Sequence, residues 1–245
     1  MVPFSVRLLA AALVLALAGA PAATAQDFAS ERRAMVDEIA TTVREVGTEI
    51  GQRAFDERVL GAMAEVPRHA FVPADQVRSA YRNRPLPIGH GQTISQPFIV
   101  ALMTDLARVE AGDRVLEVGT GSGYQAAVMA RLAQDVYTLE IIEPLGLQAM
   151  ERLSRQGYGN VHVRLGDGYH GWEEHAPYDA ILVTAAASHI PPPLIRQLRA
   201  GGRMVIPVGA SFMVQQLMLV EKRGDGSLST RQIVPVNFVP LTGTR

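Results

Sequence analysis

Apolar and polar residues follow two different rhythms along this chain, and the first part of it shows the helical one. Between Phe28 and Ile50 apolar residues recur at helical spacing, which predicts one helix with Ser30 as its N-cap. A second helix is predicted from Asp56, as its cap, to Val66. Residues 67–73 carry two prolines and should turn into an extended segment, and 81–96 should form a loop.

After Pro97, which should open a helix, short β-type runs alternate with helical ones. Strands are predicted at 115–118, 136–141, 161–165, 178–185 and 203–208, with helices at 125–133, 144–156 and 193–198. Strands separated by helices imply an α/β fold with a doubly wound, mostly parallel sheet. Two further β-rich runs on either side of Gly224-Asp225-Gly226 predict an antiparallel C-terminal hairpin at one edge of that sheet.

The first 25 residues have the layout of an export signal. Arg7 precedes an apolar run over 8–20, and Ala23-Thr24-Ala25 forms a small-residue cleavage pattern before Gln26. The run is too short to favour a membrane span. We expect a signal peptide at 1–25 and, after its cleavage, a periplasmic or secreted chain without membrane insertion. If the leader is retained, we expect a cytoplasmic chain.

The remaining residues, 26–245, are expected to form a single domain, with helices and a site loop at 26–97 and an α/β core at 98–245. Without the leader the chain has 22 basic and 24 acidic residues, a formal charge of −2, which does not suggest nucleic acid as a partner. The chain has no cysteine, which excludes disulfides, thiolate metal sites and cysteine nucleophiles. We expect a monomer.

The stretch DRVLEVGTGSGY, residues 113–124, is the strongest candidate for a binding site. A buried strand runs into three alternating glycines, and a helix follows at once, so backbone N–H groups are presented to a ligand. Glu117 precedes the first glycine, and its charge suits a cationic ligand better than a phosphate. This favours S-adenosylmethionine over a nicotinamide dinucleotide, whose fingerprint would place a glycine where Tyr124 stands.

Three further stretches follow predicted strands and should meet the glycine turn at the carboxyl edge of the sheet. Glu140 lies 23 residues after Glu117 and suits a ribose diol. Asp167, between Gly166 and Gly168, suits an adenine amino group. The small residues 184–187 would form the floor of the pocket.

Other kinds of chemistry find little support in the sequence. The six histidines show no spacing typical of metal ligands, so we expect no metal. No G-x-S-x-G motif is present, which gives hydrolase chemistry no support. Ser95 is notable because it lies in the small, polar, glycine-flanked loop before Pro97.

From about Val59 to Leu241 the chain resembles the protein-L-isoaspartate O-methyltransferase family. The resemblance rests on VPRHAFVP (66–73), LPIGHGQTISQP (86–97), VLEVGTGSGYQAAVMA (115–130), GDGYHGW (166–172), APYDAILVTAAASHIPPPLIRQL (176–198), GGRMVIPVG (201–209) and FVPL (238–241). The stretch 86–97 is specific to the family, whereas the glycine motif is shared by most S-adenosylmethionine methyltransferases. The leader departs from the family, whose typical member has none.

The resemblance implies a seven-stranded, Rossmann-like methyltransferase sheet with the family's variant order of its last strands. It implies that Ser95 is the catalytic serine and that its loop binds the substrate through His90, Gln92, Thr93 and Ile94. S-adenosyl-L-methionine would be bound by Glu117, Gly119, Thr120, Gly121, Ser122, Glu140, Asp167, Gly168 and Thr242. The partners would be proteins and peptides carrying L-isoaspartyl residues. Methylation of the free α-carboxylate would give an ester that closes to a succinimide, which reopens in part to normal aspartate.

Two alternatives remain open on the sequence. One is a methyltransferase with the same cofactor site that acts on a small carboxylic acid. The other is a non-catalytic periplasmic relative that binds peptide carboxylates without cofactor.

Overall fold

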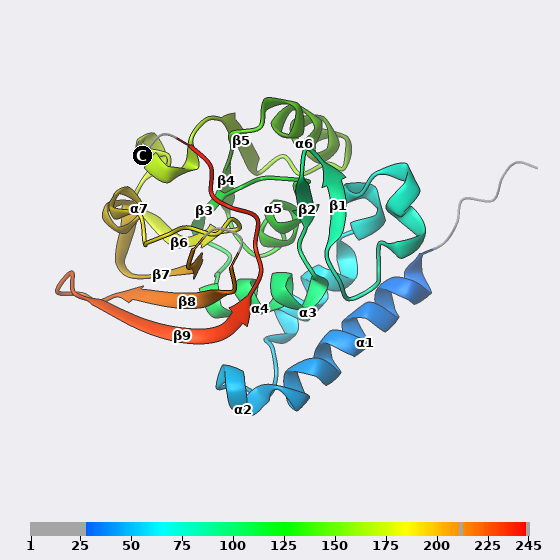
Figure 1. The fold of residues 1–245 in the computed structure, drawn as a ribbon, viewed down its shortest axis with the longest axis horizontal. Helices are drawn as coiled ribbons and strands as arrows, with labels where there is room; N and C mark the ends of the chain where they lie inside the picture. Colours follow the sequence, from blue (N-terminus) through cyan, green and yellow to red (C-terminus); the bar gives the residue numbers. More distant parts are fainter. Residues whose placement is uncertain (1–27, 211–212, 244–245) are drawn as a thin grey trace, which may run out of the picture.

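A seven-stranded sheet forms the centre of the computed structural model, which describes residues 28–210 and 213–243 (Figure 1). The strands are β3 (Arg114–Val118), β4 (Asp135–Glu140), β5 (Val161–Leu165), β6 (Tyr178–Val183), β7 (Leu198–Val208), β8 (Gln215–Lys222) and β9 (Leu228–Val236). Their order is β5-β4-β3-β6-β7-β8-β9; β3 to β7 are parallel, and β8 and β9 add antiparallel pairs. The predicted fold class and C-terminal hairpin are confirmed, whereas the predicted leader lies outside the described residues.

Neighbouring residues of each strand point to opposite sides of the sheet, and helices cover both sides, so the sheet contributes to a hydrophobic cluster on each face. Val115 belongs to the larger hydrophobic cluster, with the helices between residues 29 and 155, and Leu116 belongs to the smaller one on the other face, with the helix at 192–197. The helices of the core are α4 (Pro97–Ala107), α5 (Tyr124–Met129), α6 (Glu143–Arg155) and α7 (Pro192–Gln197); short 3₁₀ turns η3 (Gly168–His170) and η4 (Glu173–His175) follow β5.

The N-terminal extension packs against the same face as α4. It consists of α1 (Ala29–Glu45), α2 (Gly47–Ile50), α3 (Glu57–Glu65), η1 (Arg68–Phe71) and η2 (Ala74–Ser79). The prediction of a single helix over 28–50 is wrong, because Val46 interrupts the helix and separates α1 from α2. The predicted Ser30 cap is also wrong, since Phe28 occupies the N-cap position. Its ring stacks on His69 with centroids 4.3 Å apart, so tertiary packing sets where α1 begins.

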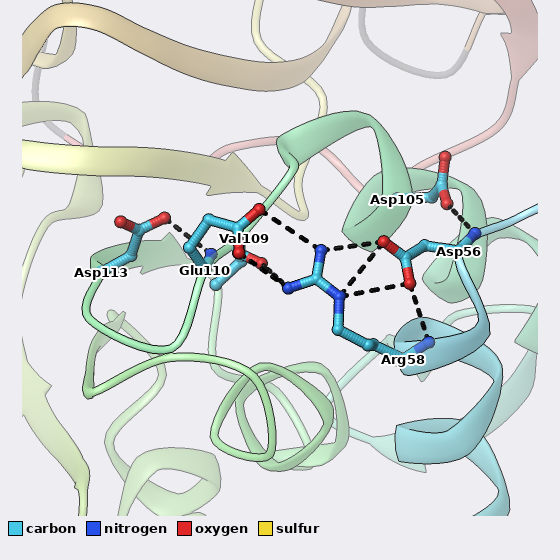
Figure 2. Close-up of polar contacts among 6 residues, drawn as sticks. All are labelled: Asp56, Arg58, Asp105, Val109, Glu110 and Asp113. Carbon is cyan, nitrogen blue, oxygen red and sulfur yellow. Dashed lines mark hydrogen bonds and ion pairs between the residues drawn. The ribbon is translucent and has the colours of Figure 1, made fainter.

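A network of charged side chains joins the extension to the core (Figure 2). The predicted Asp56 cap is confirmed: Oδ1 accepts from the Arg58 N–H at 2.8 Å. The Asp56 N–H donates to Asp105 Oδ1 of α4 at 2.6 Å, and Arg58 pairs with both Asp56 and Glu110. These contacts lie at the start of β3, the edge opposite the glycine turn, and therefore serve the scaffold.

The stretch predicted as a loop at 81–96 contains an antiparallel hairpin, β1 (Leu86–Gly89) and β2 (Gln92–Ile94). Gly89, His90 and Gly91 all have positive φ and make its turn. Residues 67–73 were predicted to be extended, but they contain η1. Two boundaries differ by four residues or more: β7 begins at Leu198 rather than at 203, and α5 ends at Met129 rather than at 133.

Candidate active site

A cavity opens at the carboxyl ends of β3, β4 and β6, between them and the β1–β2 hairpin. The C-terminal tail crosses this edge of the sheet, where Pro240 bridges Ala186 (Figure 1). Most predicted site residues line this cavity, namely Gln92, Thr93, Ile94, Ser95, Glu117, Gly119, Thr120, Gly121, Ser122, Glu140, Gly168 and Thr242. The structure thus brings segments more than 100 residues apart into one site.

The glycine turn follows β3 directly and depends on close backbone packing. Gly119 has φ +102°, and a Cβ placed on it would lie 2.6 Å from the Thr184 Oγ1 atom. That hydroxyl donates to the Gly119 carbonyl at 2.6 Å and so ties the turn to the end of β6. A side chain at Gly119 is therefore excluded both by conformation and by space.

Glu117 is a fully buried carboxylate at the bottom of the cavity. Its Oε2 accepts from the Thr138 hydroxyl at 2.6 Å, whereas Oε1 has no hydrogen-bond partner among the described residues. Burial raises the pKa of Glu117 to about 8, an effect that the Thr138 hydrogen bond opposes and the charge of Glu140 reinforces. An unpartnered buried carboxylate oxygen facing a cavity fits a ligand that brings positive charge.

Glu140 ends β4 and lies on the adjacent wall. Its Oε2 accepts from the Gly121 N–H at 2.7 Å, and its Oε1 accepts from the Ile142 N–H at 2.9 Å. Each oxygen retains a further lone pair for a ligand hydroxyl. Two carboxylates thus share one pocket, and no ion pair found in residues 28–210 and 213–243 neutralises either of them.

The opposite wall is the hairpin that carries Ser95. Register pairs Leu86 with Ile94, so these two side chains enter the core while Thr93 stays exposed. Ser95 follows β2 and is half-buried, and its hydroxyl has no protein partner within the described ranges. The Ser95 carbonyl accepts from Arg68 Nη2 at 2.7 Å. The hydroxyl is therefore available to a ligand while the backbone beside it is fixed.

Two predicted site residues lie outside the lining of the cavity. His90 is exposed at the tip of the hairpin turn. Asp167 accepts from the Tyr169 N–H at 2.9 Å and caps η3. The substrate role of His90 and the adenine role of Asp167 stay predictions.

Several lining residues were not singled out in the sequence. Val100 comes from α4, Tyr124 and Gln125 directly follow the glycine turn, Ile141 and Ile142 extend β4, and Val239 to Leu241 form the tail. Tyr124 and Gln125 could have been found from their position after the motif. The tail was indicated only through Thr242, which the family resemblance implied. Val239 to Leu241 were not predicted, because the bridge between Ala186 and Pro240 that brings them to the cavity forms only in the fold. Of the floor predicted at 184–187, Thr184 and Ala185 line the cavity, whereas Ala186 and Ala187 do not.

The histidines do not meet at a metal site. Among the residues that the structure describes, no group of three or more histidine, aspartate or glutamate side chains is arranged to hold a metal ion. His162 instead stacks on Tyr137 and contacts Asp135, away from the cavity.

A parallel sheet with a glycine turn at its carboxyl edge and an acidic pocket beside it defines the class of Rossmann-like methyltransferases. The pattern of the family described as "Protein-L-isoaspartate(D-aspartate) O-methyltransferase (PCMT)" matches residues 45–245. The chain therefore belongs to the protein-L-isoaspartate O-methyltransferase family.

Named relatives of high sequence identity support this family assignment. A "Protein-L-isoaspartate O-methyltransferase 2" of Polaromonas sp. is 79% identical over 211 residues, 86% of this chain and 100% of the relative. A "Protein-L-isoaspartate O-methyltransferase 1" of Cupriavidus necator is 62% identical over 236 residues, covering 96% of this chain and 91% of the relative.

Solved structures agree as well. One, a protein-L-isoaspartate O-methyltransferase, superimposes with a TM-score of 0.74 at 28% identity, over 85% of this chain and 66% of its own. A Plasmodium falciparum protein, described as a putative protein-L-isoaspartate O-methyltransferase and solved in complex with S-adenosyl-L-homocysteine, superimposes with a TM-score of 0.68 at 25% identity. The match covers 84% of this chain and 97% of the other.

Proposed function

We propose that this chain transfers a methyl group from S-adenosyl-L-methionine to the free α-carboxylate of L-isoaspartyl residues in damaged proteins and peptides. One observation carries the proposal: a single cavity joins the glycine turn and its two carboxylates to Gln92, Thr93, Ile94 and Ser95 of the hairpin. A cofactor wall and an acceptor wall thus face each other, as methyl transfer between two bound molecules requires.

The cofactor side is suited to a cationic nucleoside. Glu117 faces the cavity with an unpartnered oxygen and so suits the ammonium or sulfonium charge, while Glu140 can accept from ribose hydroxyls. Gly119 to Ser122 allow the backbone to approach the ligand closely. When bound, the cofactor supplies a methyl group on a positively charged sulfur, which leaves as a neutral thioether.

The acceptor side needs no general base. An α-carboxyl group has a pKa of about 3.3–3.7 and is already ionised at neutral pH. The Ser95 hydroxyl donates a hydrogen bond to one carboxylate oxygen and orients the group, while the other lone pairs stay nucleophilic. In the resulting methyl ester, methoxide can leave, whereas an ionised carboxylate has no comparable leaving group. The neighbouring backbone nitrogen therefore attacks the ester carbonyl, its N–H proton leaves with the methoxide as methanol, and the new C–N bond closes the succinimide.

The test uses protein beginning at Gln26, methyl-labelled cofactor, a short isoaspartyl peptide, its normal aspartyl twin and a free small carboxylic acid. We expect label transfer to the isoaspartyl peptide alone. Transfer to the free acid but not to the peptide would contradict the proposed acceptor. An absence of both transfer and cofactor binding would contradict the proposed reaction altogether.

We also propose that the chain is exported. The support is the sequence of the leader: Arg7, the apolar run at 8–20 and the small residues before Gln26. Expression of the full chain in a Gram-negative host, followed by fractionation and N-terminal sequencing, should give a periplasmic protein that starts at Gln26. Full-length protein in the cytoplasm would contradict export.

We further propose a monomer without membrane insertion after cleavage. Within the described ranges, no helix combines the length and apolarity that a bilayer span requires. Light scattering of the purified protein should give the mass of one chain, and a mass of two chains across a dilution series would contradict the monomer.

A further inference from the structure

Arg68 is a buried charge without an opposite charge beside it. Its side chain is completely buried, at the first residue of η1. No carboxylate in the described part of the chain forms an ion pair with it. Burying an unpaired guanidinium is unfavourable because the charge loses its hydration without gaining an opposite charge. A fold that keeps such a group must gain something from its contacts.

Those contacts are with two carbonyls and one aromatic face. Arg68 Nε donates to the Ala80 carbonyl at 2.8 Å, and Nη2 donates to the Ser95 carbonyl at 2.7 Å. The guanidinium carbon lies 4.8 Å from the centre of the Tyr124 ring, within cation–π range. Nη1 has no partner among the described residues. Although burial lowers the pKa of Arg68 to about 10, the group stays charged at neutral pH.

These three partners come from different parts of the site. Ala80 follows η2, Ser95 directly follows β2 of the hairpin, and Tyr124 lines the cavity as the first residue of α5 after the glycine turn. Arg68 therefore joins the wall that carries Ser95 to the start of the helix behind the cofactor turn. The hairpin has only two strands and lies outside the main sheet, so such external support matters for its position.

We propose that Arg68 is a positioning residue for methyl transfer. It holds the Ser95 backbone so that the neighbouring hydroxyl meets the acceptor carboxylate, and its positive charge favours the anion at that wall. The inference rests on the proposed function, because it assumes an anionic acceptor next to Ser95. It also explains an arginine rather than a lysine: a planar fork donates to two carbonyls at once, whereas an ammonium is a point charge.

The experiment compares Arg68→Lys and Arg68→Met with a matched control, Arg203→Met. Arg203 also donates to a backbone carbonyl, that of Leu106 at 3.1 Å, but lies outside the cavity lining. For each protein, kcat and KM with the isoaspartyl peptide, the Kd for S-adenosyl-L-homocysteine and the Tm are measured. We expect Arg68→Lys to lower kcat/KM about tenfold or more, as for a lost hydrogen bond to a charged group, with the Kd within about threefold of wild type. Arg203→Met should change neither kcat/KM nor the Kd for S-adenosyl-L-homocysteine.

A double-mutant cycle with Ser95→Ala separates positioning from general support. If Arg68 acts through Ser95, Arg68→Lys should cost less than about threefold in kcat/KM in the Ser95→Ala background. Independent, multiplying losses would overturn the inference, as would an Arg68→Lys enzyme as active as wild type. Failure of both Arg68 variants to give a folding transition would assign the residue to the scaffold alone. A wild-type protein that does not methylate the peptide would instead contradict the proposed function.

Discussion

The two walls of the cavity are built in different ways. The cofactor wall is the continuation of β3 and β4, central strands of a seven-stranded sheet, and its ligand groups are backbone atoms and two carboxylates. The acceptor wall is a two-stranded hairpin outside that sheet. Side chains hold it from outside: Arg68 through the Ser95 carbonyl, and Asn83, whose Oδ1 accepts from the Phe98 N–H at 3.0 Å.

We therefore expect the two walls to control different properties: the cofactor wall controls cofactor affinity, and the acceptor wall controls the rate of methyl transfer. A wall fixed by sheet hydrogen bonds offers little freedom, so changes there should alter cofactor affinity first. A wall held by a few side chains can shift by fractions of an ångström, and misplacement of an orienting group affects the transfer rate more than cofactor binding. Four substitutions can break or sharpen this contrast.

The largest effect is expected from Gly119→Ala on the cofactor wall. The new methyl group would lie 2.6 Å from the Thr184 hydroxyl, at a φ of +102° that alanine avoids. Calorimetry should detect no binding of S-adenosyl-L-homocysteine. Gly91→Ala is the control, because its φ is also positive at +69° but no atom lies within 4 Å of the added Cβ. Equal binding losses in both variants would show that strain alone, rather than the contact with Thr184, is responsible.

Next in size is Ser95→Ala on the acceptor wall. Losing a hydrogen bond to a charged group costs about 1.5–3 kcal/mol, so kcat with the isoaspartyl peptide should fall about 10- to 100-fold. Cofactor affinity should stay within about twofold of wild type, which equilibrium binding measures. Ser188→Ala, at a serine bonded to His189 outside the main cavity, should leave turnover unchanged. A Ser95→Ala enzyme with full activity would remove the serine from the reaction.

A smaller effect is expected from Glu117→Gln. Opposite charges a few ångströms apart are worth about 1–4 kcal/mol, so S-adenosyl-L-methionine should bind roughly tenfold more weakly to the variant above pH 8. Because the pKa of Glu117 is raised to about 8, wild-type affinity should increase as the pH rises through that value. The variant should lack this component, and the difference between the two proteins subtracts the cofactor's own titration. Identical pH profiles would exclude Glu117 as the charged partner.

The same carboxylate makes stability depend on pH. An unfolded glutamate loses its proton near the ordinary value of 4.5, whereas buried Glu117 keeps it until about pH 8. The folded state binds more protons in this window, so the free energy of unfolding should fall between these pH values. Glu117→Gln should flatten that fall in denaturant titrations. A steeper fall in the variant would contradict the assigned burial effect.

The smallest effect on function is expected from Asp56→Ala, far from either wall. Loss of the α3 cap should lower the free energy of unfolding by about 1 kcal/mol. The Arg58 and Asp56 side chains are 49% and 42% exposed, so the loss of the ion pair between them adds little (Figure 2). Both KM values and kcat should match those of wild type at 25 °C. A loss of turnover would show that the extension influences the acceptor wall.

The cofactor wall could be read from the sequence because its elements are local. Asp113 to Tyr124 combines a β-branched strand, glycines where positive φ is needed and a helix former, and each choice supports the same structure. Sheet topology then places Glu117 and Glu140 together, since carboxyl ends of parallel strands meet at one edge. The acceptor wall was harder to predict from the sequence. Leu86, Ile88 and Ile94 have the alternation of a hairpin, but two prolines and three positive-φ residues at 89–91 disguised it as a loop.

The sequence by itself determined the α/β class, the hairpin at the end of the sheet, the glycine turn and, through its resemblance, the family. Periodicity and turn chemistry act over a few residues, so they can be read without knowledge of the tertiary contacts. Only the tertiary structure decided that Phe28 occupies the N-cap position of α1, that Val239 to Leu241 line the cavity, and that Arg68 lies buried with its guanidinium bonded to the Ser95 carbonyl. Arginine in PRHAF reads as a surface residue. Its burial depends on contacts with Ala80, Ser95 and Tyr124, which are distant in the sequence, so no local sequence pattern predicts it.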